Sequence, residues 1–446
     1  MVGIADPGAI VRLSAFAKLF RPGLRVKRWL ALMLAGLALA LLGLALLMNG
    51  RTLDLLGAAS HFWRWLADSG RIRWGSSASL GLGIGLTVAG ALAIVVGASK
   101  LMSSLSSAIA PAGSPAQLVD AVYRSRTLSL GPRVVVIGGG TGLSTMLRGL
   151  KQYTSNIVAI VTVTDDGGSS GKLQRQLSIL PPGDIRNCLV ALADSEGTMT
   201  DLLQYRFRGQ GIGEGLRDHA FGNLFIAAMC DIAGGDFEEA VRRTSRVLNI
   251  RGRVLPSTLK RVSLVAEMED GSTVEGETNI VHSPLRIRRV ALNPADAEAP
   301  EEVIEAIRLA DIIVVGPGSI YTSVVPNLLV HGIPEAIYRS PAKKVFICNV
   351  MTQPGESDGF TASDHLRAIE AHVRRPIVQY VVVNTGTPSL ELLDKYRQTG
   401  ATLVEPDIDR VRKMGYRTLP GNYVSLTDVV RHDPARLAEA ILRLIL

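Results

Sequence analysis

The chain has few of the residues that mark several common protein classes. Its three cysteines, Cys188, Cys230 and Cys348, are far apart in the 446 residues and lack CxxC spacing, so the sequence predicts neither a disulfide framework nor a zinc site. This cysteine usage fits the reducing cytosol. Its glycine-rich loops also lack the GxGxxG pattern, which disfavours a nicotinamide dehydrogenase.

Acidic residues are scarce in the N-terminal part of the chain. Residues 1–131 carry 13 Lys and Arg against 4 Asp and Glu, whereas the remaining residues carry 35 against 36. The net charge of +8 therefore belongs to the N-terminal part. A DNA-binding domain carries its basic stripe on the folded unit itself, so this distribution argues against a nucleic-acid partner.

Two long uncharged stretches in this N-terminal part predict a transmembrane hairpin over residues 29–99. Trp29–Met48 contains 20 residues without a charge, which matches the roughly 20 residues that a helix needs to cross a bilayer. A second uncharged stretch runs from Trp74 to Ser99 and includes several glycines, which let two membrane helices approach closely. We expect the helices at about 29–48 and 78–98.

The flanking charges predict the orientation of this hairpin. The basic N-terminus, residues 1–28, lies in the cytoplasm by the positive-inside rule, so the loop 49–73 lies outside and the main domain lies in the cytoplasm. A multi-pass protein of the cell membrane is thus expected. A linker, residues 100–131, follows with a short helix around Pro115–Arg124. A cleaved signal peptide and a buried pair of core helices are the weaker alternatives.

From Arg133 onward the pattern predicts an α/β domain over residues 132–446. Short β-branched runs alternate with amphipathic stretches of helix length, as in a parallel sheet built from βαβ units. Within it, Thr258–Ile280 alternates apolar and polar residues and predicts a β-hairpin insertion. Ligands of open α/β sheets bind beyond the carboxyl ends of the strands. The predicted strands are Val134–Gly138, Ile157–Val163, Ile312–Val315, Lys344–Asn349 and Ile377–Val383.

The loop after the first predicted strand is rich in glycine and precedes a predicted helix, Leu143–Gln152. Glycines let the backbone approach a phosphate, and the N-terminus of a helix offers unpaired N–H groups. The spacing is not that of a P-loop, and a purely structural turn stays open as an alternative. The candidate ligand-binding residues here are Gly138, Gly139, Gly140, Thr141 and Gly142.

Two adjacent acids, Asp165 and Asp166, follow the second predicted strand. Such a pair can hold a divalent ion such as Mg²⁺, contact sugar hydroxyls, or act as a catalytic base. The spacing does not choose among these roles, and a role in stabilising a turn or capping the next helix is also open.

A third candidate region precedes the apolar run that starts at Cys188. Asp184 can cap the helix, while Arg186 and Asn187 stand in its first turn. Because an arginine is unfavourable at the positive end of a helix, Arg186 indicates an anionic partner. Further on, Asn223 is a candidate for binding a base or sugar, and His219 is expected to be structural.

Two later loops add hydroxyl and amide groups. The loop at 316–323 follows a strand, and the loop at 349–356 offers side chains suited to a uracil, an amide or a sugar. A turn at Asn384–Thr387 is expected to be structural only. The candidate ligand-binding residues of the two loops are Gly316, Gly318, Ser319, Thr322, Ser323, Asn349, Thr352 and Gln353.

Taken together, these segments resemble one known family. They read GGGTGLS at 138–144, VTDDGGSSG at 163–171, PPGDIRNCLVALA at 181–193, FGNL at 221–224, GPGSIYTSVVPNLLV at 316–330 and NVMTQPGES at 349–357. In this order they are similar to the gluconeogenesis-factor branch of the family that also holds the 2-phospho-L-lactate transferases. The resemblance covers about residues 133–430.

The resemblance implies a Rossmann-like fold and a site for UDP-N-acetylglucosamine or a related UDP-sugar. It implies a regulatory role in cell shape and in wall-precursor supply under gluconeogenic growth, with an enzyme of that supply as a partner. The transferase branch implies an alternative, a Mg²⁺-dependent transfer of a nucleotide-activated phosphoester, with Asp165 and Asp166 catalytic or metal-binding. Whether the chain is an enzyme stays open, as does a homo-oligomer. The carried-over site comprises the glycine loop, Asp165, Asp166, Asp184, Asn223 and residues 316–323.

Overall fold

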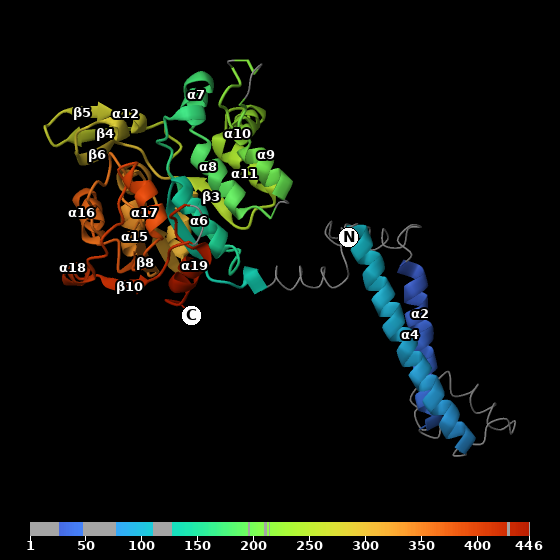
Figure 1. Ribbon diagram of the computed structural model, residues 1–446. Helices are drawn as coiled ribbons and strands as arrows, with labels where there is room; N and C mark the ends of the chain where they lie inside the picture. The colour runs from blue at the N-terminus through green and yellow to red at the C-terminus, as the bar shows by residue number, and fades with distance from the viewer. Residues whose placement is uncertain are drawn as a thin grey trace, which may run out of the picture. The chain divides into compact units, whose positions relative to one another are not determined.

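The computed structural model describes residues 26–47, 77–109, 127–194, 197–208, 212–213, 215–425 and 429–445 (Figure 1). These belong to two compact units, Met1–Arg124 and Ser125–Leu446. The predicted outer loop 49–73, the helix at 115–124 and nearly all of the N-terminus 1–28 lie outside the described residues.

In the described residues of the first unit, α2 (Val26–Leu47) and α4 (Ser77–Ile109) pack against each other. Glycine permits their close approach. A Cβ atom added to Gly36 would lie 2.8 Å from the Gly90 carbonyl oxygen, and one added to Gly43 would lie 2.4 Å from Thr87 Oγ1. These contacts are of the kind that small residues allow between membrane helices.

The lengths of the two apolar helices agree only in part with the predicted transmembrane hairpin. Among the described residues, one helical stretch, Leu80–Ser103 of 24 residues, is long and apolar enough to cross a membrane. The apolar part of α2, Arg28–Leu44, is shorter. A pair of transmembrane helices is thus unconfirmed and stays a prediction.

The second unit is built on a parallel seven-stranded sheet in the order β10-β9-β8-β7-β1-β2-β3, which confirms the predicted α/β class. The central strands consist of Val and Ile with every residue buried, as expected where helices cover both faces. Each predicted strand lies in this sheet, with small shifts at its ends. The strands are β1 (Val134–Gly138), β2 (Ile157–Val161), β3 (Arg253–Pro256), β7 (Ile312–Val315), β8 (Lys343–Ile347), β9 (Tyr380–Asn384) and β10 (Arg417–Gly421).

The strand order reverses between β1 and β7. The chain first runs outward from β1 to β3, then returns to β7 and continues to β10 on the other side. A crevice opens at the carboxyl ends of the strands where such an order reverses, and it is the usual ligand site of open α/β sheets. The loops after β1 and β7 therefore border this switch point.

The helices form two packed groups. Helices α6, α8 and α19 pack together with α10 and α11, while α13, α14, α15, α16 and α18 form the other group. Because parallel crossovers are right-handed, the reversal of direction puts the two groups on opposite faces of the sheet. The helices are α6 (Gly140–Leu150), α7 (Gly168–Leu177), α8 (Gly183–Leu192), α9 (Gly197–Gln204), α10 (Phe221–Ile232), α11 (Phe237–Leu248), α13 (Glu301–Leu309), the π-helix η2 (Ile320–Val324), α14 (Val325–Leu329), α15 (Ile333–Arg339), α16 (Ala362–His372), α17 (Leu390–Arg397), α18 (Ile408–Lys413) and α19 (Pro434–Leu442).

The predicted hairpin insertion is larger than a hairpin. Strands β4 (Ser263–Met268) and β5 (Thr273–Glu275) pair as expected, with the turn at Gly271 at φ +84°. A third strand, β6 (Ile287–Asn293), pairs with β4, and the chain between them forms a short helix, α12 (Glu277–His282). The insertion lies beyond the carboxyl ends of the strands (Figure 1).

Candidate functional site

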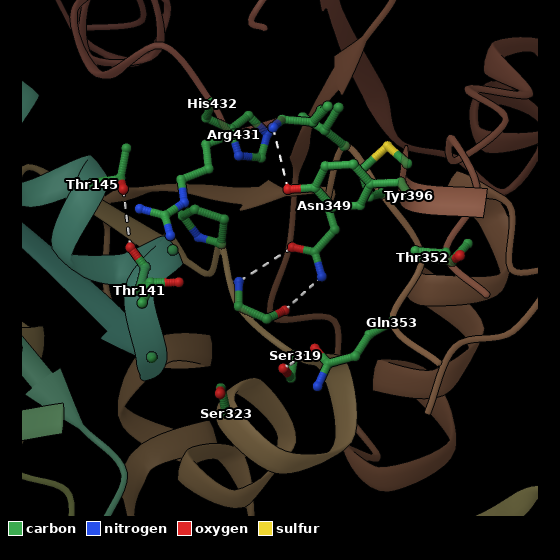
Figure 2. Close-up of a pocket in the computed structure, with 18 of the residues that line it drawn as sticks. Thr141, Thr145, Ser319, Ser323, Asn349, Thr352, Gln353, Tyr396, Arg431 and His432 are labelled. Carbon is green, nitrogen blue, oxygen red and sulfur yellow. Dashed lines mark hydrogen bonds between the residues drawn. The ribbon is translucent and has the colours of Figure 1, made fainter. Parts of the chain in front are cut away.

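A cavity of about 390 Å³ lies at the switch point, and we call it the ligand cavity (Figure 2). Its walls come from the loops after β1, β7 and β8 and from the segment that precedes α19. Ten of the predicted ligand-binding residues line it, which are Gly139, Gly140, Thr141, Gly142, Gly318, Ser319, Ser323, Asn349, Thr352 and Gln353.

The glycine loop forms one wall of the ligand cavity. Helix α6 begins earlier than predicted, at Gly140, whose φ of +66° favours glycine. A Cβ atom on Gly142 would lie 2.8 Å from the Pro317 carbonyl oxygen, so the absence of a side chain lets the two loops meet. The first turn of α6 thus directs its positive dipole end and the backbone N–H groups that follow Gly140 toward the cavity, while the Gly140 N–H itself is donated to Asp184.

The loop after β7 forms the opposite wall and is held by Asn349. The Asn349 side chain accepts a hydrogen bond from the Gly318 N–H at 3.2 Å and donates one to the Gly318 carbonyl at 2.8 Å (Figure 2). Ser319 donates to Gln353, whose amide nitrogen donates to Glu356. The amide groups of Asn349 and Gln353, which the sequence suggested for contacts to a base, thus form hydrogen bonds within the protein. These bonds position the loop.

A second cavity of about 270 Å³, which we call the acidic cavity, gathers the polar residues that follow β2. Arg186, 8% exposed, donates through Nη1 to Asn223 at 2.8 Å and through Nη2 to Asn187 at 2.8 Å. The Arg186 Nε is buried without a partner among the described residues. The predicted residues that line this cavity are Asp165, Asp184, Arg186, Asn187 and Asn223.

Asp184 joins the two cavities. The prediction that it caps α8 is wrong, because that helix begins at Gly183 with no side-chain cap. Asp184 Oδ2 instead accepts a hydrogen bond from the Gly140 N–H at 2.7 Å. Burial raises the pKa of Asp184 to about 6, and burial likewise raises the pKa of Asp165.

Asp165 and Asp166 have different hydrogen-bond partners. Asp165 accepts a hydrogen bond from the Gly167 N–H at 3.0 Å and lines the acidic cavity. Asp166 points to the insertion, where it accepts bonds from Thr278 N at 3.0 Å and Thr278 Oγ1 at 2.7 Å. Within the described part of the chain, no group of three or more His, Cys, Asp or Glu side chains is placed to hold a metal ion.

Besides Asp166, three predicted residues line neither cavity. Gly138 ends β1, and its carbonyl accepts a hydrogen bond from Asn327 at 3.1 Å. Gly316 turns the chain after β7 at φ +80°. Thr322 is buried and donates to Glu356 at 2.8 Å. The expectation for His219 fits its surroundings, since it is buried with Nδ1 at 3.1 Å from Ser169 Oγ.

Sequence reasoning missed several residues of these cavities. Arg431 and His432 precede α19 and line the ligand cavity together with Tyr396. Figure 2 shows Arg431 extending toward Thr141 of the glycine loop, and no carboxylate among the described residues forms an ion pair with it. His432 is buried beside the Cys348 carbonyl at 3.2 Å, and burial lowers its pKa to about 4. A lone arginine in a loop gave no motif to find.

Two acids beside the candidate site, the buried Glu356 and the half-buried Glu277, were missed as well. Burial raises the pKa of Glu356 to about 7, and burial together with the charges of Asp165 and Asp184 raises the pKa of Glu277 to about 9. These glutamates lie in the NVMTQPGES segment and at the start of α12. Carboxyl groups with raised pKa values often gather around functional sites.

The sequence and the fold both match known proteins. The sequence model of the family described as 2-phospho-L-lactate transferase CofD matches residues 134–424. A relative from Nostoc sp. is 44% identical over 97% of this chain and 93% of its own length. The gluconeogenesis factor of Bacillus subtilis is 47% identical over 70% of this chain and 98% of its own.

The solved structure of a protein from Bacillus halodurans is similar to this chain, with a TM-score of 0.67 and 49% sequence identity. The match covers 70% of this chain and 99% of the Bacillus halodurans chain. Relatives of this length therefore consist of the sheet-containing unit alone. The order of motifs, the fold and these identities agree. The chain thus belongs to the family that unites the gluconeogenesis factors with the 2-phospho-L-lactate transferases.

Proposed function

We propose that the ligand cavity binds a nucleotide sugar of the UDP-N-acetylglucosamine type and that the chain is a regulatory protein of wall-precursor supply and cell shape. One observation carries this proposal. At the switch point of the sheet, the N-terminus of α6 and the guanidinium of Arg431, which forms no ion pair with a described residue, face the same cavity. Backbone N–H donors and an arginine are the groups that bind a diphosphate.

The names of the relatives favour the regulatory part of this proposal. The relative from Bacillus subtilis is named a gluconeogenesis factor, and the role in gluconeogenic growth comes to this chain from that likeness. A wall-precursor enzyme as the regulated partner belongs to the same proposal. We further propose that α4 and α2 attach the protein to the cell membrane, with the second unit in the cytoplasm.

Calorimetric titration of residues 127–446 tests the ligand. We expect UDP-N-acetylglucosamine to bind without turnover and GDP and NAD to bind more weakly. Replacing Arg431 with glutamine is expected to lower the affinity for the UDP-sugar by about tenfold, because one charge-assisted contact to phosphate is lost. Arg443→Gln, an exposed arginine of the C-terminal segment, is the matched control and should leave the affinity unchanged. Equal affinities for wild type and Arg431→Gln would exclude the assigned phosphate position.

The acidic cavity favours a second candidate, a transferase of a nucleotide-activated phosphoester. It places Asp165, Asp184 and Arg186 beside the glycine loop, where acids can take a proton or hold Mg²⁺ and arginine can stabilise phosphate charge. Here Mg²⁺ would be held by Asp165 and Asp184, since Asp166 is bound to Thr278.

Asparagine variants separate the two candidates. If the protein is a transferase, Asp165→Asn is expected to lower its turnover of a nucleotide diphosphate ester at least about a hundredfold, since a removed acid–base group typically costs this much. Asp166→Asn should have a smaller effect, because its carboxylate binds the insertion. Turnover is followed by phosphorus NMR with and without Mg²⁺. A larger loss for Asp166→Asn than for Asp165→Asn would contradict this assignment.

A further inference from the structure

Basic side chains gather at the edge of the sheet where the strands begin, which we call the amino edge. They stand just before β7, β8, β9 and β10 or in the first residues of these strands. This edge is opposite to the ligand cavity, because all seven strands are parallel. The exposed cations are Arg308, Arg339, Lys343, Arg374, Arg375, Arg412, Lys413 and Arg417.

The acids at this edge pair with only some of the cations. Asp311, directly before β7, pairs with Arg133 at 2.8 Å. Glu335 is shared by Arg339 and Arg375, and Asp409 lies 4.0 Å from Arg412. The Glu370 carboxylate accepts a hydrogen bond from the Tyr416 hydroxyl and forms no ion pair with a described cation. Within the described ranges, no carboxylate forms an ion pair with Arg308, Lys343, Arg374 or Lys413.

Helix dipoles explain only part of this pattern. Arg308, Arg339 and Lys413 stand in the last turns of α13, α15 and α18, where a cation stabilises the negative end of a helix. Lys343 and Arg374 belong to no helix. Helix dipoles therefore do not explain the two cations outside the helices.

Two depressions at this edge hold several of the basic residues. Arg308 shares the first with Arg133, Leu309 and Pro341, and Arg374, Arg375 and Tyr416 line the second. Arg375 also contacts α15, because its guanidinium stacks on Tyr338 at 5.2 Å and pairs with Glu335.

Exposed apolar side chains stand among these cations. Leu309 and Tyr338 are each 44% exposed, and Leu130, which precedes β1, is 87% exposed. Lysine and arginine next to exposed leucine and tyrosine make up the surface that proteins present to the headgroup region of a bilayer. The anionic lipids of the cytoplasmic leaflet attract each nearby cation by about 1 kcal/mol.

We propose that the amino edge binds the surface of a bilayer that contains anionic phospholipids. The proposal rests on the membrane attachment proposed above, and the chain itself adds an argument. The polypeptide that follows α4 enters the second unit at this edge, through Arg133 and the start of β1. The carboxyl ends of the strands, and with them the ligand cavity, then open away from the lipid.

Vesicle co-sedimentation of residues 127–446 tests this surface. The fragment is suitable because the solved relative consists of this unit alone, and it lacks both apolar helices. We expect it to bind vesicles that contain phosphatidylglycerol and not vesicles of phosphatidylcholine, with binding that falls as salt increases. The variant Arg308→Glu, Lys343→Glu, Arg374→Glu is expected to bind the anionic vesicles at least about tenfold more weakly.

The matched control reverses three exposed arginines elsewhere, as Arg217→Glu, Arg261→Glu, Arg286→Glu, with the same change in net charge. The proposal is overturned if the control loses as much binding as the edge variant, if the wild-type fragment ignores anionic lipid, or if the edge binds RNA in preference to vesicles. Titration of the edge variant with UDP-N-acetylglucosamine should give the wild-type affinity, so failure of the nucleotide proposal is seen separately.

Discussion

Replacing Gly149 with alanine is expected to lower the free energy of unfolding of the second unit by about 3 kcal/mol, the upper range for overpacking. Gly149 lies on α6 where α19 crosses it. A Cβ atom there would lie 2.0 Å from the Pro434 carbonyl oxygen and 3.2 Å from Ala438 Cβ. Because the first of these atoms is backbone, α19 must move away to admit the methyl group.

Urea unfolding of residues 127–446 measures this effect, and Gly197→Ala is the matched control. Gly197 begins α9, and no atom of a described residue lies within 4 Å of an added Cβ, so this variant should keep the wild-type stability. Movement of α19 also shifts Arg431 and His432, which precede it, so Gly149→Ala is expected to weaken ligand binding. Wild-type stability of Gly149→Ala would show that the packing of α19 on α6 differs from the structure.

The stability of the ligand-free second unit is expected to fall as the pH rises from about 4.5 to about 7, with Glu356 as a main cause. Glu356 is 5% exposed, and burial raises its pKa from 4.5 to about 7. A raised pKa in the folded state favours folding below the unfolded pKa, and this contribution is lost as the pH rises through the folded value. The shift corresponds to about 3 kcal/mol.

Glu356→Gln is therefore expected to raise the free energy of unfolding at pH 8 by up to about 3 kcal/mol. The glutamine oxygen can keep the hydrogen bonds that Thr322 and Gln353 donate at 2.8 Å and 2.9 Å. Its amide nitrogen cannot accept the bond that the Tyr321 N–H donates at 3.3 Å, which reduces the gain. Some pH dependence should persist, because the pKa values of Asp184 and Glu277 are also raised. Thermal unfolding from pH 5 to pH 8 measures the effect. The exposed Glu305→Gln is the control, and a less stable Glu356→Gln at pH 8 would refute the explanation.

The sequence predicted the central strands of the sheet because they are buried on both sides. Strand β7 consists of Val and Ile only, and β1 does so up to its last residue, Gly138. The two outermost strands escaped prediction for the opposite reason. Strand β3 begins at the exposed Arg253 and ends in Pro256, and β10 has no buried residue. An edge strand pairs on one side only, so its sequence does not need the apolar run that marks a central strand.

The candidate site could be located from the sequence but not resolved in detail. The glycine loop and the loop after β7 follow buried strands, and the carboxyl ends of parallel strands meet at one edge. The hydrogen-bond partner of each side chain could not be predicted. The partner of Asp166 is Thr278, 112 positions later, and Asn349 bonds Gly318, 31 positions earlier. Such pairs are set by tertiary structure, on which local spacing carries no information.

The hydrogen bond between Asp184 and the Gly140 N–H belongs to both cavities at once. A ligand that takes this N–H for its own phosphate removes a partner that stabilises the ionised form of Asp184. Anything that alters the charge of Asp184 must, in turn, alter the affinity for that ligand by the same factor, since thermodynamic coupling is reciprocal. This hydrogen bond therefore couples the protonation of Asp184 to the binding of any anion at the Gly140 N–H.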